Sequence, residues 1–97
     1  MKKIPRDKPF DIQEFLTTPE DRAGFLEAVA EINDPGLLRS AILEVARAQG
    51  VADVARRAGL GQKTLFKSLG ENGNPTLDTV TRVLGALNLR LEIRPAS

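Results

Sequence analysis

Residues 55–69 read ARRAGLGQKTLFKSL, and this stretch predicts two short helices that meet at a sharp turn. Ala55 and Gly59 stand four residues apart, which places a small residue one helical turn before a glycine. Two steeply crossed helices need a small side chain where they approach, and the turn between them needs a residue that adopts left-handed backbone angles. We therefore predict a helix–turn–helix unit, with Leu60 and Leu65 directed into its corner.

The same assignment indicates which side chains of the second helix face outward. A recognition helix presents its N-terminal residues to base edges in the major groove of DNA. There a glutamine can pair with adenine, a lysine can reach guanine, and a threonine can touch a thymine methyl group or a phosphate. The residues predicted to do so are Gln62, Lys63, Thr64 and, one turn later, Lys67.

Arg56 and Arg57 lie on the preceding helix, which in such a unit crosses the DNA backbone. Phosphate groups are therefore their predicted targets. The stretch holds four bases and no acid, which favours this interpretation. Basic side chains on short amphipathic helices are often only solvated, however, so the spacing alone leaves a solvated basic face open.

The flanking segments also predict helices. Thr18 and Pro19 have the residue types of a helix start, as do Asp34 and Pro35, and Gly50 follows the second of these helices as a stop signal. Apolar residues recur at helical spacing in residues 19–33, 34–50 and 76–88. The sequence GENGNP at 70–75 is rich in turn-forming residues and lacks the pattern of a phosphate-binding loop.

The composition of the 97-residue chain excludes several kinds of chemistry. It contains no cysteine and no histidine, so it offers no disulfide, no thiolate and no imidazole base or ligand. We expect no catalysis, no cofactor and no metal. No apolar run reaches the length of a membrane span, and the basic start is not followed by the apolar core of a secretory signal. A cytoplasmic protein that does not contact membranes is the expectation.

Charge is unevenly distributed along the chain. Residues 1–8 hold four bases and one acid, residues 9–50 hold three bases and eight acids, and residues 51–97 hold seven bases and four acids. This polarity favours two partners of opposite charge. Residues 1–10 show no periodicity, so we predict a flexible basic arm there, followed by an acidic helical extension over residues 11–33.

The segment LRLEI at 89–93 alternates apolar and charged residues, which predicts a half-buried β-strand. Leu89, Leu91 and Ile93 would form its apolar side. Because no second strand is visible in the sequence, we expect this strand to pair with its copy across a two-fold axis and so form a homodimer. The alternative is that the segment folds back on its own core.

Three segments carry a resemblance to a known family. VARRAGLGQKTLFKSL at 54–69, GNPT at 73–76 and LNLRLEI at 87–93 resemble the addiction-module antidote family, which comprises HigA-like antitoxins with an Xre-type helix–turn–helix. The resemblance covers nearly the whole chain from about residue 10. It implies an antitoxin that neutralises a RelE/HigB-like mRNA-cutting toxin and represses its own operon by binding double-stranded operator DNA.

The acidic helix over residues 19–33 is the segment that we predict to contact such a toxin. An RNA-cutting partner is basic, and acidic side chains would steer its approach. The alternative is a solvated helix face whose acids favour the helix dipole. The candidate toxin-binding residues are Glu20, Asp21, Glu27 and Glu31.

Together these patterns predict an all-α protein. It would consist of an Xre/lambda-repressor-like helix–turn–helix domain over residues 34–97, with the N-terminal helical extension before it and a short C-terminal β-strand at its end. Two other functions stay open at this point. One is a stand-alone Xre-type transcriptional regulator without a toxin partner, and the other is an interaction module that binds no DNA.

Overall fold

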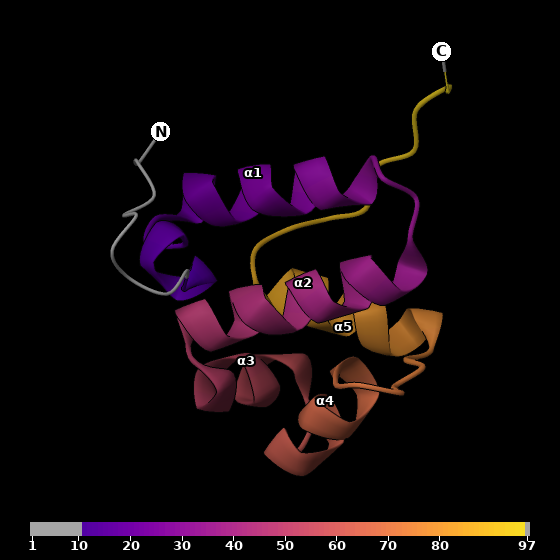
Figure 1. Ribbon diagram of the computed structural model, residues 1–97. Helices are drawn as coiled ribbons and strands as arrows, with labels where there is room; N and C mark the ends of the chain where they lie inside the picture. Colours follow the sequence, from indigo (N-terminus) through magenta and orange to yellow (C-terminus); the bar gives the residue numbers. More distant parts are fainter. Residues whose placement is uncertain (1–10, 97) are drawn as a thin grey trace.

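A computed structural model describes residues 11–96, and every regular element within them is a helix. Figure 1 shows α1 on one side of α2 and the pair α3 and α4 on the other, with α5 behind α2. The flexible arm predicted for residues 1–10 lies outside the described residues. The elements are η1 (Ile12–Phe15), α1 (Pro19–Ala30), α2 (Pro35–Gln49), α3 (Val51–Ala58), α4 (Gln62–Leu69) and α5 (Leu77–Ala86).

The predicted helix starts at Pro19 and Pro35 are confirmed, and local hydrogen bonds explain them. The hydroxyl of Thr18 accepts from the backbone N–H of Asp21 at 3.0 Å, and the Asp21 carboxylate accepts from the N–H of Thr18 at 3.2 Å. This reciprocal pair is a capping box. At α2 the carboxylate of Asp34 accepts from two backbone N–H groups of the first turn, at 3.0 and 3.2 Å. Both caps satisfy donors that a helix otherwise leaves unpaired.

The core lies around α2 and is built from aliphatic side chains. All of its fully enclosed residues are small or branched apolar residues, and no polar residue among those described is buried. Helix α2 contacts η1, α1, α3 and α4, while α5 packs mainly on α3. The largest side chains that are almost completely buried come from α2, α3, α4 and α5, and they are Val45, Val54, Leu65, Leu69 and Val83.

The N-terminal extension is attached to the core by specific polar contacts. The side-chain amide of Gln13 in η1 donates to the backbone carbonyl of Glu44 at 2.9 Å and to its carboxylate at 2.8 Å. Arg22 of α1 donates to the carbonyl of Leu16 at 3.0 Å, which closes the connection between η1 and α1. Leu16 itself is buried in the core. The extension is therefore packed against α2 rather than held apart from it.

The predicted C-terminal β-strand is wrong. Residues 89–96 form no regular secondary structure, and Asn88 turns the chain out of α5 with a φ of 60°. Leu89 packs against the core, but Leu91 and Ile93 are 54% and 98% exposed. The alternation of residues 89–93 predicted half-burial, yet a strand also needs a hydrogen-bonded neighbour, and none lies beside this segment within the described residues. Instead the segment passes between α1 and α5 as a single extended length of chain (Figure 1). Without a strand at this position, the predicted pairing of two copies through Leu89, Leu91 and Ile93 has no structural basis.

Candidate nucleic-acid interface

The turn between α3 and α4 has the geometry that residues 55–69 predict. Gly59 adopts left-handed angles, with φ of 72° and ψ of 31°, and the backbone N–H of Leu60 donates to the carbonyl of Ala55 at 2.9 Å. Ala55 and Leu65 are buried at the junction, and Leu60 packs partly against the core. The inward positions predicted from the spacing are therefore confirmed, and three residues separate the two helices.

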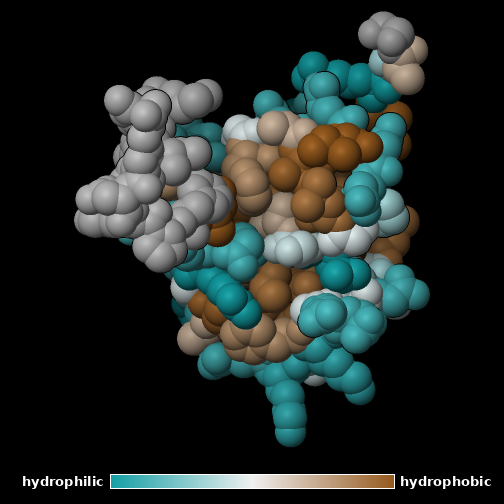
Figure 2. Space-filling model, in the orientation of Figure 1, coloured by the Kyte–Doolittle hydropathy of each residue, from teal (hydrophilic) through white to brown (hydrophobic). Residues whose placement is uncertain are grey.

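The outward face of α4 is polar and accessible. The four side chains predicted to read bases are all exposed, whereas Leu65 and Leu69 on the opposite face are buried. Neither Lys63 nor Lys67 forms an ion pair with any residue in the described part of the chain. Figure 2 shows hydrophilic side chains projecting from the end of the molecule where Figure 1 draws α3 and α4. The structure thus brings Gln62, Lys63, Thr64 and Lys67 together on one solvent-facing helix.

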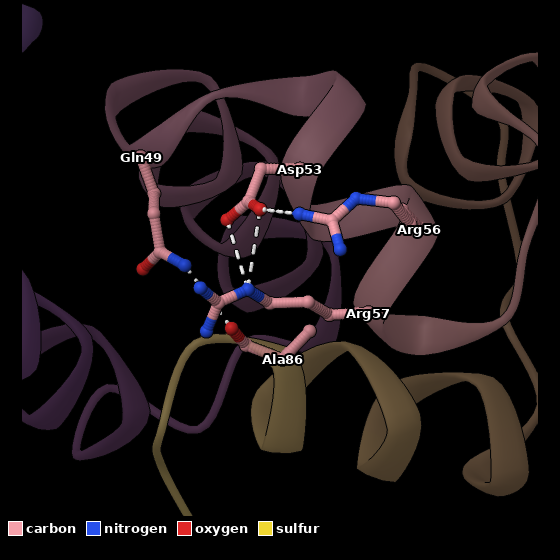
Figure 3. A network of polar contacts seen from close by, with 5 residues as sticks. All are labelled: Gln49, Asp53, Arg56, Arg57 and Ala86. Atoms are coloured by element: carbon pink, nitrogen blue, oxygen red, sulfur yellow. Dashed lines mark hydrogen bonds and ion pairs between the residues drawn. The ribbon is translucent and has the colours of Figure 1, made fainter.

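The two arginines of α3 differ from the lysines of α4, because both are paired. The Asp53 carboxylate accepts from the Arg57 Nε at 3.1 and 3.2 Å, and its Oδ1 also accepts from Arg56 (Figure 3). These are pairs at helical spacings of three and four residues, and the arginine side chains stay half or more exposed. One negative charge therefore offsets part of the positive charge of Arg56 and Arg57, which remain accessible to an anion.

The first turns of α3 and α4 lack the side-chain caps that the other helices have. Gly50 and Gly61 occupy the N-cap positions, and neither helix has a side-chain hydrogen bond there. By contrast, Asp11, Thr18, Asp34 and Thr76 cap the remaining described helices. Beside Lys63, the backbone N–H groups at the start of α4 would be available to a phosphate oxygen.

Two residues of this surface were not predicted from the sequence. Phe66 is 40% exposed on α4, and the guanidinium of Arg47, at the end of α2, lies 5.6 Å from the centroid of its ring. Arg47 also faces the Glu44 carboxylate at 3.7 Å. An available signal was the spacing of Phe66, which follows Gln62 and Lys63 by one helical turn and so shares their face. The contribution of Arg47 could not be read from the sequence, since it depends on how α2 and α4 cross.

The acidic helix α1 lies on the other side of α2 from this surface (Figure 1). Glu20, Glu27 and Glu31 are exposed, and their spacing of seven and four residues puts them on one side of the helix. Asp21 differs, because its carboxylate is used in the capping box and also accepts from the Thr17 hydroxyl at 3.2 Å. Three of the four candidate toxin-binding acids therefore form one face, and the fourth stabilises the start of the helix.

A shallow hollow adjoins this acidic face. Glu27 and Glu31 line it from α1, and the other walls come from α2, α5 and the C-terminal segment. Leu38, Ile42 and Leu84 contribute apolar surface to it, and Figure 2 shows apolar surface exposed on the same side of the molecule as α1. Within residues 11–96, no group of three carboxylates or other metal-binding side chains could hold an ion, and no helix is long and apolar enough to cross a membrane.

These observations define a small helical protein. It carries a basic helix pair, α3 and α4, at one end and an acidic helix, α1, at the other. Residues 6–95 match the family described as "Probable addiction module antidote protein", and the chain belongs to that family. It is also 37% identical, over 87 residues, to an uncharacterized protein of Haemophilus influenzae (strain Rd). That similarity covers 90% of each chain. No solved structure matches the chain.

Proposed function

We propose that this member of the antidote family is the antitoxin of a type II toxin–antitoxin module. It neutralises a RelE/HigB-like toxin encoded beside it and represses its own operon by binding operator DNA through α3 and α4. It acts by binding rather than by catalysis. Membership of the antidote family supports the antitoxin role, and the resemblance described above supports the class of toxin.

The observation that carries the DNA-binding part is the pair Lys63 and Lys67 on the exposed face of α4. Both are charged, accessible and free of ion pairs with described residues, and α4 itself contains no acidic residue. Lysine in the first turns of a recognition helix can contact guanine in the major groove. Arg56, Arg57 and the uncapped amides of α4 lie next to them in the chain and would contact phosphates.

Fluorescence anisotropy tests the DNA-binding part of the proposal. It measures the affinity of the protein for DNA from the region upstream of its gene. The double variant Lys63→Ala, Lys67→Ala should lose at least about tenfold in affinity at fixed salt, because one good base contact contributes about 1–3 kcal/mol. The matched control is Arg90→Ala, Arg94→Ala, which removes two exposed bases from the C-terminal segment and should have a much smaller effect. Equal losses in the two double variants would contradict the assignment of α4 as the recognition helix.

Acidic side chains on α1 support the toxin-binding part. Glu20, Glu27 and Glu31 present negative charge toward solvent along one side of the helix, which suits a basic, RNA-cutting partner. Co-expression with the neighbouring gene tests it directly. The intact chain should restore growth when the neighbouring protein is produced. If the chain bound operator DNA but gave no rescue and no complex, it would be a stand-alone regulator instead.

A further inference from the structure

Phe66 is an exposed aromatic side chain in polar surroundings. The residue is 40% exposed, although the other large apolar residues of α4, Leu65 and Leu69, are buried. Gln62 and Lys63 precede it by four and three residues, so all three share one face of the helix. Lys67 follows it directly. The ring therefore lies within the surface proposed to enter the major groove.

Arg47 contacts the Phe66 ring from the neighbouring helix α2. Its guanidinium lies over the ring, 5.6 Å from the centroid, which is within the range of a cation–π contact. Arg47 also forms an ion pair with the Glu44 carboxylate, at 3.7 Å, one turn earlier on α2. The Arg47 side chain is still half exposed. One cation thus lies over the ring, and Phe66 still keeps a part of its surface accessible to solvent.

We propose that Phe66 is a specificity-determining residue that contacts the 5-methyl group of a thymine in the operator, with Arg47 as its positioning residue. The proposal rests on the DNA-binding function proposed above. Among base edges in the major groove, only thymine presents an apolar group, and phenylalanine is one of the side chains that pack against it. The lysines on either side, Lys63 and Lys67, make this face suited to nucleic acid rather than to an apolar protein surface.

Replacing single thymines by 2′-deoxyuridine tests the contact, because this change removes only the methyl group and keeps every hydrogen-bonding atom of the base. The probes are duplexes of the gene's upstream DNA, each with uracil at one thymine. At one position of the site, replacing thymine by uracil should lower the affinity of the unchanged protein for the duplex about fourfold. This is the effect expected from losing the burial of one methyl-sized apolar group. In Phe66→Ala the same replacement should have no effect, and Phe66→Leu, which keeps an apolar side chain, should retain part of it.

Thr64→Ser is the matched control, since Thr64 is exposed on the same helix and its own methyl group could contact thymine. This variant keeps the hydroxyl and should retain the full uracil effect. A uracil effect that disappears in Thr64→Ser and persists in Phe66→Ala would overturn the assignment. So would equal affinity of the unchanged protein for thymine and uracil at every position. A chain that bound none of the duplexes would instead refute the DNA-binding function itself.

A separate measurement tests whether Arg47 positions the Phe66 ring. In Arg47→Ala the ring loses its cation, so the uracil effect should shrink at the same thymine while effects of changes at other base pairs stay the same. Arg47→Lys, which can still place a charge near the ring, should restore part of it. If Arg47→Ala lowered affinity equally for thymine and uracil duplexes, Arg47 would only contribute positive charge, and its positioning role would be overturned.

Discussion

A single carboxylate, that of Asp53, accepts from Arg57 at 3.1 Å and from Arg56 on the same helix (Figure 3). Both arginines are candidates for phosphate contacts, so phosphate and Asp53 compete for the same guanidinium groups. Exposed pairs of this kind contribute little to stability. We expect their effect on DNA binding to be larger, because Asp53 lowers the net positive charge of the helix that would face the DNA backbone.

Asp53→Asn should therefore strengthen binding to DNA of any sequence by a similar factor and leave the ratio of affinities for operator and other DNA nearly unchanged. Phosphate contacts are sequence-independent, and each one added steepens the fall of log affinity with log salt by about 0.9. Anisotropy titrations with operator and unrelated duplexes across a salt series would measure both effects. Glu92→Gln is the control, because it frees Arg94 from a comparable pair at 3.2 Å on the C-terminal segment. An equal gain in both variants would indicate a general charge effect rather than a local one.

The turn glycine and a helix glycine should respond oppositely to alanine. Gly59 has a φ of 72°, so Gly59→Ala should lower the free energy of unfolding by about 1–2 kcal/mol, the cost of a left-handed non-glycine residue. Gly85 lies inside α5 with nothing within 4 Å of an added Cβ atom. Gly85→Ala should raise the free energy of unfolding by about 0.5–1 kcal/mol. Urea unfolding followed by circular dichroism compares them, and a stabilised Gly59→Ala would contradict the turn geometry.

Gly61 offers a test of the missing cap on α4. It has φ of −72° and ψ of 151°, extended angles that a serine N-cap adopts without strain. Gly61→Ser should stabilise the protein by a few tenths of a kcal/mol, roughly the difference between these N-cap residues, whereas Gly61→Ala should destabilise it. Thermal unfolding of the three proteins should rank serine above glycine above alanine. Any other order would show that the first turn of α4 is satisfied by some other group.

The acids of α1 should divide into two kinds. Glu27→Gln, Glu31→Gln should slow association with the neighbouring toxin several-fold at low salt and leave stability nearly unchanged, since both side chains are exposed and act by steering. Asp21→Ala should instead lower stability by about 0.5–2 kcal/mol, because it removes the acceptor that completes the capping box. Stopped-flow association and thermal unfolding separate these effects. Glu71→Gln, an exposed acid between α4 and α5, is the control for association and should leave the rate unchanged.

Much of the fold could be predicted because the relevant signals are local. Thr18, Asp34 and Gly59 each determine the backbone within a few residues, and the structure uses them as their residue types indicate. The prediction of a strand over residues 89–93 was wrong because a strand depends on contacts that are not local. Alternation reports which side chains could be buried, but a strand depends on a second segment, and the described chain supplies none. Leu89 alone of the three apolar residues there packs against the core.

The candidate site was predictable to a similar extent. The exposed face of α4 follows from helical spacing once Leu65 is placed inward, and the structure has that arrangement. The pairing of Arg56 and Arg57 with Asp53 could also have been read from spacings of three and four residues. The contact of Arg47 with Phe66 could not, because the two residues are 19 positions apart in sequence and meet only where α2 and α4 pack together.

Glu44 contacts both the N-terminal extension and Arg47. Its carboxylate and backbone carbonyl accept from Gln13 of the extension, and the same carboxylate faces Arg47, which covers Phe66. A shared acid of this kind links the free energies of the two regions, and such linkage is reciprocal. A partner on α1 that displaced η1 would alter how firmly Arg47 is held, and DNA on α4 would alter how firmly η1 is held. We therefore expect the stability of the extension and the binding properties of α4 to be coupled through Glu44.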